Sequence, residues 1–285
     1  MVKIIADSTC DLQKEIVEEY GISILPLHII CHENDYLDGV NITPAEIFAW
    51  ADENKTTPKT SAAAPAEAVD LLSPYVHAGR DVVCIAISDA FSTTGNVLRM
   101  TADAMNEEAG RQQVHVINSA NLSTGLGLLV LEAATMAKEG MEAEQIVENI
   151  EALIPKVRAS FVVDTLTYLH RGGRCSGLAA LAGGALKLHP QIVVKDGKMD
   201  VAKKYRGNMD KVLLEYTKEM TDALMHAKKN RVFITHSGCN KEVVDSIREY
   251  ITGLNVFEEI IETTAGGVIS SHCGPGTLGV LFIAE

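Results

Sequence analysis

Aromatic side chains are scarce in this chain of 285 residues, since Phe, Trp and Tyr together make up only 5% of it. Hydrophobic residues of all kinds reach 47%, so any core must be mainly aliphatic. The length is generous for one core and comfortable for two domains.

Positive charge is also in short supply, because 38 Asp and Glu residues outnumber 25 Lys and Arg residues, for a formal net charge of -13. A binder of nucleic acid or of an anionic membrane needs a basic surface, so both partners are disfavoured. A small anionic ligand is not excluded, because a pocket can be locally positive although the net charge of the protein is negative.

The sequence lacks long hydrophobic runs. Its first residues, Met1–Asp7, contain no apolar segment of signal-peptide length, and the longest apolar stretches, near 126–130 and 178–186, are too short to span a bilayer. None of the six cysteines forms a CxxC pair, and a chain of this size needs no disulfide framework. We therefore expect free thiols, a cytoplasmic location and no integral membrane segment.

Several enzyme signatures are missing. The sequence contains no GxSxG, GxxxxGK[ST] or HExxH motif, and its His and Cys residues show no zinc-type clustering. Gly274–Gly279 matches GxGxxG, but only six residues follow it here, too few for the helix and strand of a dinucleotide unit. We therefore predict no cofactor and no metal.

Apolar strand-like runs alternate with helical patterns in the first half. Strands are predicted at 2–6, 22–31, 82–87 and 114–117, and Pro26 is a candidate break in the second. Helices are predicted at 11–20 and from about 94 and 124. Thr43-Pro44-Ala45-Glu46 is typical of a helix start with a capping box. The rhythm predicts an α/β fold whose amino-terminal domain, residues 1–157, holds a mostly parallel sheet.

A second α/β domain is predicted over residues 158–285. Strands at 191–194 and 199–203 flank Asp196-Gly197, a hairpin signal. The other elements expected are strands at 161–164, 232–235, 260–263 and 278–283 and helices at 208–228 and 242–252. Hairpins mixed with crossovers indicate a mixed sheet.

Four loops rich in hydroxyl groups follow predicted strands, at 7–9, 59–61, 88–95 and 119–125. Ligands of open parallel sheets bind at the carboxyl ends of strands, where hydroxyls and backbone N–H groups can receive an anion. Helix capping is the favoured explanation of any one loop taken alone, although several such loops could converge on one crevice. Ser92-Thr93-Thr94 has the highest density of hydroxyl groups.

Two further segments have alternative interpretations. His272, at the entrance of a glycine-rich loop, is either a ligand-facing donor or a satisfied loop histidine. The basic turn His170–Arg174 either contacts phosphate or carboxylate groups or is a helix end with a glycine stop and a cationic last turn.

The ordered series of motifs resembles the DegV family of bacterial fatty-acid-binding proteins. The resemblance covers nearly the whole chain. The motifs are Asp7–Leu12, Pro26-Leu27, Thr60-Ser61, Ile87-Ser88, Ser92–Thr94, Phe161–Leu166, Tyr168–Arg174, 187–190, Tyr205-Arg206, His272 and Gly274–Gly276.

The resemblance implies two α/β domains with a lipid tunnel between them and no enzymatic activity of the chain's own. The implied ligand is a long-chain fatty acid, and the implied partner is a separate fatty acid kinase that phosphorylates the bound carboxylate. Ser92 and His272 would contact the carboxylate, with Thr60 or Ser61 assisting. The implied binding set also includes Thr94, Ser119 and Gly274, and the implied kinase-facing residues are Arg171, Arg174 and Arg206.

Two positions depart from the family pattern, because Thr93 stands where glycine is common and Asn118 where aspartate is common. Two other functions stay open: an acyl hydrolase or acyltransferase that uses Ser92 and His272 as nucleophile and base, and a lipid-responsive regulatory protein. The sequence leaves the chain length of the fatty acid and the protonation state of its head group undetermined.

Overall fold

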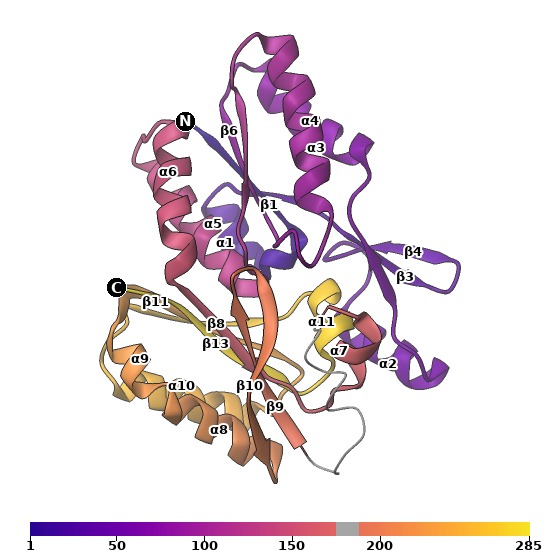
Figure 1. Cartoon of the computed structure of the whole chain (residues 1–285), viewed down its shortest axis with the longest axis vertical. Coiled ribbons are helices and arrows are strands. Elements are labelled where there is room, and N and C mark those ends of the chain that lie inside the picture. The colour runs from indigo at the N-terminus through magenta and orange to yellow at the C-terminus, as the bar shows by residue number, and fades with distance from the viewer. Residues whose placement is uncertain (175–187) are drawn as a thin grey trace.

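The computed structural model describes residues 1–174 and 188–285, which form three β-sheets covered by helices (Figure 1). The apolar stretch at 178–186 lies outside the described residues, as does Cys175. The five described cysteines are free, as predicted. Across the described ranges, no helix combines the length and the apolarity that a membrane crossing requires.

The first sheet is entirely parallel and confirms the predicted βαβ rhythm. Its strands are β2 (Ser23–Leu25), β1 (Lys3–Asp7), β6 (Val82–Ala86) and β7 (Val114–Asn118), in that order across the sheet. Helices α3 (Pro65–His77) and α4 (Thr94–Ala109) cover one face, and α5 (Ser123–Lys138) and α6 (Ala143–Leu153) cover the other. Because both faces are covered, β1 and β6 are buried along their whole length.

A small antiparallel sheet branches from the first one. It contains β4 (Asn34–Leu37), β3 (His28–Cys31) and β5 (Lys59–Ser61). The predicted break at Pro26 separates β2 from β3, which belong to different sheets. Helix α2 (Pro44–Asn54) begins with the predicted capping box: Thr43 Oγ1 accepts the Glu46 N–H, and Glu46 Oε2 accepts the Thr43 N–H.

The third sheet is mixed, as predicted. Its order is β10 (Lys198–Arg206), β9 (Leu188–Lys195), β8 (Val157–Val162), β13 (Thr277–Ala284), β11 (Ala227–Ser237) and β12 (Glu259–Thr264). Only the β11–β12 pair is parallel. Helices α8 (Met209–Glu219) and α10 (Lys241–Gly253) cover its outer face. The remaining elements are η1 (Ser8–Cys10), α1 (Lys14–Glu19), η2 (Ile154–Lys156), α7 (Thr167–Gly172), α9 (Thr221–Met225) and α11 (Gly267–Cys273).

Two predicted element boundaries are wrong. The single helix expected at 208–228 is two helices, and β11 already begins at Ala227, which pairs with Ala284. At the break, Thr221 Oγ1 bonds the Lys218 carbonyl, a side-chain bond that competes with the helix ladder. The first helix begins at Lys14 instead of residue 11, because Asp11 has a left-handed backbone (φ 52°).

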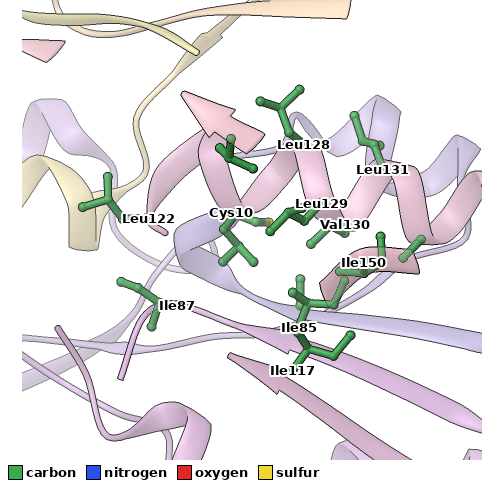
Figure 2. Close-up of a cluster of buried hydrophobic side chains, with 14 of the residues drawn as sticks. Cys10, Ile85, Ile87, Ile117, Leu122, Leu128, Leu129, Val130, Leu131 and Ile150 are labelled. Atoms are coloured by element: carbon green, nitrogen blue, oxygen red, sulfur yellow. The ribbon is translucent and has the colours of Figure 1, made fainter. Parts of the chain in front are cut away.

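Helix α5 lies between the first and third sheets and packs against β1 and β6 on one side and β8, β11 and β13 on the other. A helix that is apolar on all faces is buried on all faces, and in α5 every residue from Ser123 to Ala134 is buried. In Figure 2, Leu128 and Leu131 point away from Ile85 and Ile117 of the parallel sheet. The two halves therefore share one core cluster.

Replacing Leu129 by Ala should lower the free energy of unfolding by about 2–5 kcal/mol, because it leaves a cavity where α5 is fully buried. Urea unfolding measures this. Val69→Ala is the matched control, since Val69 is 42% exposed and its truncation should change stability by less than about 0.5 kcal/mol. A loss below about 1 kcal/mol at Leu129 would contradict the central role of α5.

Candidate functional site

Two adjoining cavities lie where the halves of the chain meet. The outer one has a volume of about 470 Å³, and its wall includes the hydroxyl residues Thr60, Ser61, Ser92 and Thr93. The inner one is narrower, about 60 Å³. Both are lined by Leu122, Met199, Ile269 and His272, which form the neck between them.

The inner cavity presents hydrocarbon despite several hydroxyl residues in its wall. Its apolar lining includes Phe161, Leu169 and Leu281. Its hydroxyl groups are bonded within the protein: Ser123 to Asp11, Thr235 to Thr124, Ser237 to the Gly274 carbonyl, and Thr277 to the Cys273 carbonyl. Because these groups have partners already, an apolar occupant would leave none of them unsatisfied.

His272 sits on α11 at the neck, and its Nε2 lies 2.8 Å from Thr60 Oγ1 of β5. Burial, with a further contribution from Arg174, lowers the pKa of His272 to about 4, so the ring is neutral near pH 7. The close approach of α7 depends on Gly172, because a Cβ there would lie 2.3 Å from His272 Nδ1.

Ser92 lies in the loop before α4, partly exposed on the outer wall. Its Oγ accepts the Thr94 N–H at 3.2 Å and lies 2.8 Å from Thr94 Oγ1. Ser92 therefore stabilises the start of a helix and also faces the cavity, so both interpretations of this loop apply. Its hydroxyl bonds Thr94 while His272 bonds Thr60, an arrangement that lacks the nucleophile–base contact of a serine hydrolase.

The two departures from the family pattern have simple local consequences. Thr93 has φ −86° and ψ 4°, a conformation open to any L-residue, so this backbone does not require glycine. Asn118 Oδ1 accepts the N–H groups of Ala120 (3.0 Å) and Asp89 (3.3 Å). An aspartate would accept the same two bonds, so the substitution preserves the acceptor and removes the charge.

The other predicted residues fall into two groups. Thr94 and Ser119 are fully buried and bonded within their own loops, and Gly274 packs on the Tyr168 ring with φ 77°. None of these three lies on the described lining, so their contact with a ligand stays a prediction.

The three arginines also separate. Arg171 and Arg206 are exposed on the surface. Arg174 lines the outer cavity and donates to the Gly172 carbonyl and the Phe91 carbonyl. Arg174 is exposed as well, and a cation on a cavity wall attracts an anion, which is one of the two roles that the sequence left open for this basic turn.

Sequence reasoning missed three buried carboxylates, Asp7, Asp11 and Asp38. Burial raises the pKa of all three, that of Asp7 to about 6. Asp7 accepts bonds from Thr9 and from the Ile87 N–H, which ties η1 to the end of β6. The sequence signals were the loop at 7–9 and the motif Asp7–Leu12, and the hydroxyl groups of that loop donate to Asp38 and Asp7.

Asp11 and Asp38 hold the first turn of α11. Asp11 Oδ1 accepts the Gly266 N–H at 2.9 Å, and Asp38 Oδ1 accepts the Gly267 N–H at 2.7 Å. Both carboxylates lie in the first half of the chain, whereas α11 lies in the second. They therefore fix the helix that carries His272. Among residues 1–174 and 188–285, no group of His, Cys, Asp and Glu side chains is arranged to hold a metal ion.

Replacing Gly172 by Ala should displace the His272 ring from Thr60, because the new methyl group would overlap Nδ1. The ring should then become exposed and its pKa should rise toward 6.5. NMR titration of the His272 ring measures this. In the unmodified protein, the ring signals should not titrate between about pH 5.5 and 8.

The control for this substitution is Gly253→Ala, since Gly253 ends a helix with open space where its Cβ would lie. It should leave the His272 signals unchanged. An ordinary His272 pKa in the unmodified protein would show that the ring is not buried as described.

Comparison with known proteins confirms the resemblance seen in the motifs. The family model described as "Uncharacterised protein, DegV family" matches residues 1–285. A DegV domain-containing protein of Clostridium acetobutylicum is 31% identical over 286 residues, covering 100% of this chain and 99% of the relative. One of Caldanaerobacter subterraneus is 30% identical over 283 residues, covering 99% and 98%.

Solved structures are similar to this chain over its whole length. A DegV family protein from Thermus thermophilus, described as binding fatty acid, has a TM-score of 0.90 at 29% identity, covering 100% of this chain and 99% of that one. A stearic-acid-binding protein from Eubacterium ventriosum has a TM-score of 0.88 at 29% identity, covering 100% and 98%. Motifs, family model and structural neighbours agree: the chain belongs to the DegV family.

Proposed function

We propose that this protein binds a long-chain fatty acid, with the carboxylate in the outer cavity and the hydrocarbon chain entering the inner cavity through the neck. The observation that carries the proposal is the junction of the two cavities. A polar chamber opens through Leu122, Met199, Ile269 and His272 into a crevice whose hydroxyl groups already have partners. Fatty acid binding by the similar proteins from T. thermophilus and E. ventriosum supports the same assignment.

The energetics favour such a ligand. A saturated chain of about fifteen methylenes gains on the order of 12 kcal/mol on leaving water, at roughly 0.8 kcal/mol for each methylene. Ordering and association costs remove several kcal/mol of this. Tight binding therefore needs only modest help from the head group.

The head group meets hydrogen-bond donors and one cation. Ser92 and Thr60 offer hydroxyl groups, and Arg174 places a positive charge on the same wall. His272 is neutral and acts through its bond to Thr60. These groups hold an ionised carboxylate and leave its carbon untouched, which suits a carrier more than a catalyst.

We propose further that a partner fatty acid kinase phosphorylates the carboxylate presented at the outer cavity. Arg171 and Arg206 give this acidic protein exposed positive charge, and Arg174 lines the outer cavity. The chemistry of the phosphate transfer, with its nucleotide and metal, belongs to the kinase. A cytoplasmic location is part of this proposal.

Palmitate titrated calorimetrically into delipidated protein should bind, and Ser92→Ala should weaken the binding about 10-fold or more through the loss of a hydrogen bond to a charged group. Ser73→Ala is the matched control, because Ser73 bonds the Val69 carbonyl on an exposed helix face. Mass spectrometry of an organic extract should also identify the fatty acid that copurifies. Absence of both palmitate binding and copurifying fatty acid would refute the proposal.

Reconstitution with a bacterial fatty acid kinase and ATP tests the partner separately. Acyl phosphate should form, and Arg171→Ala with Arg206→Ala should reduce its rate without changing palmitate affinity. Full palmitate binding with no acyl phosphate would refute the kinase partnership alone and would favour a lipid-responsive regulatory role.

A further inference from the structure

A third cavity lies farther along α5, at Leu131, and its lining includes residues of α1 and of the edge strand β12. Its volume is about 370 Å³, and it shares no described lining residue with the two cavities of the proposed fatty acid site. Its wall includes Tyr20, which directly follows α1, Leu131 of α5 and Arg231 of β11. Figure 1 shows α1 beside α5, between the parallel sheet and the third sheet.

Arg231 is the unusual residue of this cavity. It is only 7% exposed, and among the described residues its Nε and Nη1 have no hydrogen-bond partner. The nearest carboxylate oxygen, Glu259 Oε2, lies 3.7 Å from Nε, beyond hydrogen-bond distance. Arg231 therefore has an ion pair with Glu259 but no hydrogen bond from Nε or Nη1 to any described residue. This is unusual, because a buried guanidinium normally uses its donors fully and unsatisfied buried donors are costly.

The neighbouring aromatic ring offsets only part of this cost. The Arg231 guanidinium carbon lies 6.0 Å from the centroid of the Tyr20 ring, at the limit of a cation–π contact, and Lys138 Nζ lies 4.1 Å from the same centroid. An apolar side chain at position 231 would pack against Leu131 without any such cost. The charge is therefore better explained by an acceptor that enters the cavity.

The other lining residues indicate which further chemical groups the ligand would carry besides an acceptor for Arg231. Glu19 and Glu259 both line the cavity and are exposed, so a simple anion would meet two like charges. A ligand with a positive group next to its carboxylate would pair with both signs. The isoleucines at 16, 260 and 261 supply apolar surface for an aliphatic part.

We propose that this cavity binds an aliphatic α-amino acid in its zwitterionic form. The carboxylate pairs with Arg231, the ammonium group pairs with Glu259 and Glu19, and the side chain packs on the isoleucines. Nε and Nη1 are buried and have no acceptor among the described residues where they lie, so the guanidinium must turn toward the cavity to reach the ligand. This turn loosens the ion pair with Glu259 and breaks no hydrogen bond of Nε or Nη1 to a described residue. The site is independent of fatty acid binding.

Occupancy would also connect the two halves of the protein. Glu19 lies in the first half, whereas Arg231 and Glu259 lie on neighbouring strands of the second half, in register with each other. A ligand that contacts all three binds the folded protein and not the unfolded chain. The melting temperature should therefore rise with ligand concentration.

Calorimetric titration of the full chain, saturated with palmitate, with L-isoleucine tests the site. Two matched probes isolate the charges: 3-methylpentanoate lacks the ammonium group and 2-methylbutylamine lacks the carboxylate. We expect L-isoleucine to bind and each truncated probe to bind about tenfold more weakly or worse, through loss of a charge-assisted hydrogen bond. Saturation with palmitate keeps the acid probe out of the other site.

Arg231→Met should weaken isoleucine binding by about tenfold or more, because it removes the carboxylate partner at similar side-chain length. Arg111→Met is the control, since Arg111 forms a surface pair with Asp81 and should leave binding unchanged. If Arg231→Met does not fold, the exposed pair Glu19→Gln and Glu259→Gln gives the same test through the ammonium group.

Three results would overturn the proposal: no isoleucine binding at millimolar concentration, equal binding of 3-methylpentanoate, or unchanged isoleucine affinity in folded Arg231→Met. Unchanged affinity in the double glutamine variant would overturn the assignment of the ammonium partners. Failure of palmitate to bind would concern the fatty acid site alone, because isoleucine binding is then measured on the palmitate-free protein.

Discussion

The bonds from Asp11 and Asp38 to the start of α11 are the interaction on which the candidate site depends. The two carboxylates accept the backbone N–H groups of Gly266 and Gly267, which no intrahelical acceptor can satisfy. Ser123 and Ser8 donate to their remaining oxygens. Burial makes these charges costly, as their raised pKa values indicate, and the donors offset that cost.

Fixing the start of α11 determines where His272 lies near the other end of this short helix. With its first turn fixed, α11 places His272 against Thr60 of β5 and leaves room for α7 only because residue 172 is glycine. Three segments that are distant in sequence thus meet at one imidazole ring. The ring is neutral because it is buried, so the charge available to an anion at this wall is that of Arg174.

Cavities occur at two positions along helix α5. The helix is buried between two sheets of different shape, and its residues belong to one core cluster shared by both halves. Leu122, just before the helix, lines the two cavities of the proposed fatty acid site, whereas Leu131 lines the cavity that contains Arg231. Figure 2 shows Leu122 well apart from Leu131, with the first turns of α5 between them.

The sequence alone determined the features that depend on local chemistry. Alternating strand and helix patterns predicted the parallel sheet, Thr43 and Glu46 predicted a capping box that formed, and the ordered motifs identified the family. The sequence contains these signals directly, because the helix, strand and capping patterns are short-range and the family motifs depend only on residue order. The same local signals misjudged residues 208–228, where strand pairing between Ala227 and Ala284 overrode helical periodicity.

Only the tertiary structure decided which polar residues face a cavity. Residue type and position after a strand did not separate Thr60, Ser92, Thr94 and Ser119, and only the family resemblance placed Ser92 and Thr60 first. In the fold, Thr60 and Ser92 reach the outer wall, while Thr94 and Ser119 are buried in their own loops. Likewise, Arg174 reaches the cavity and Arg171 does not lie on its described wall. Whether a side chain faces the cavity depends on how segments distant in sequence pack together. Residue type and spacing along the chain do not predict this packing directly.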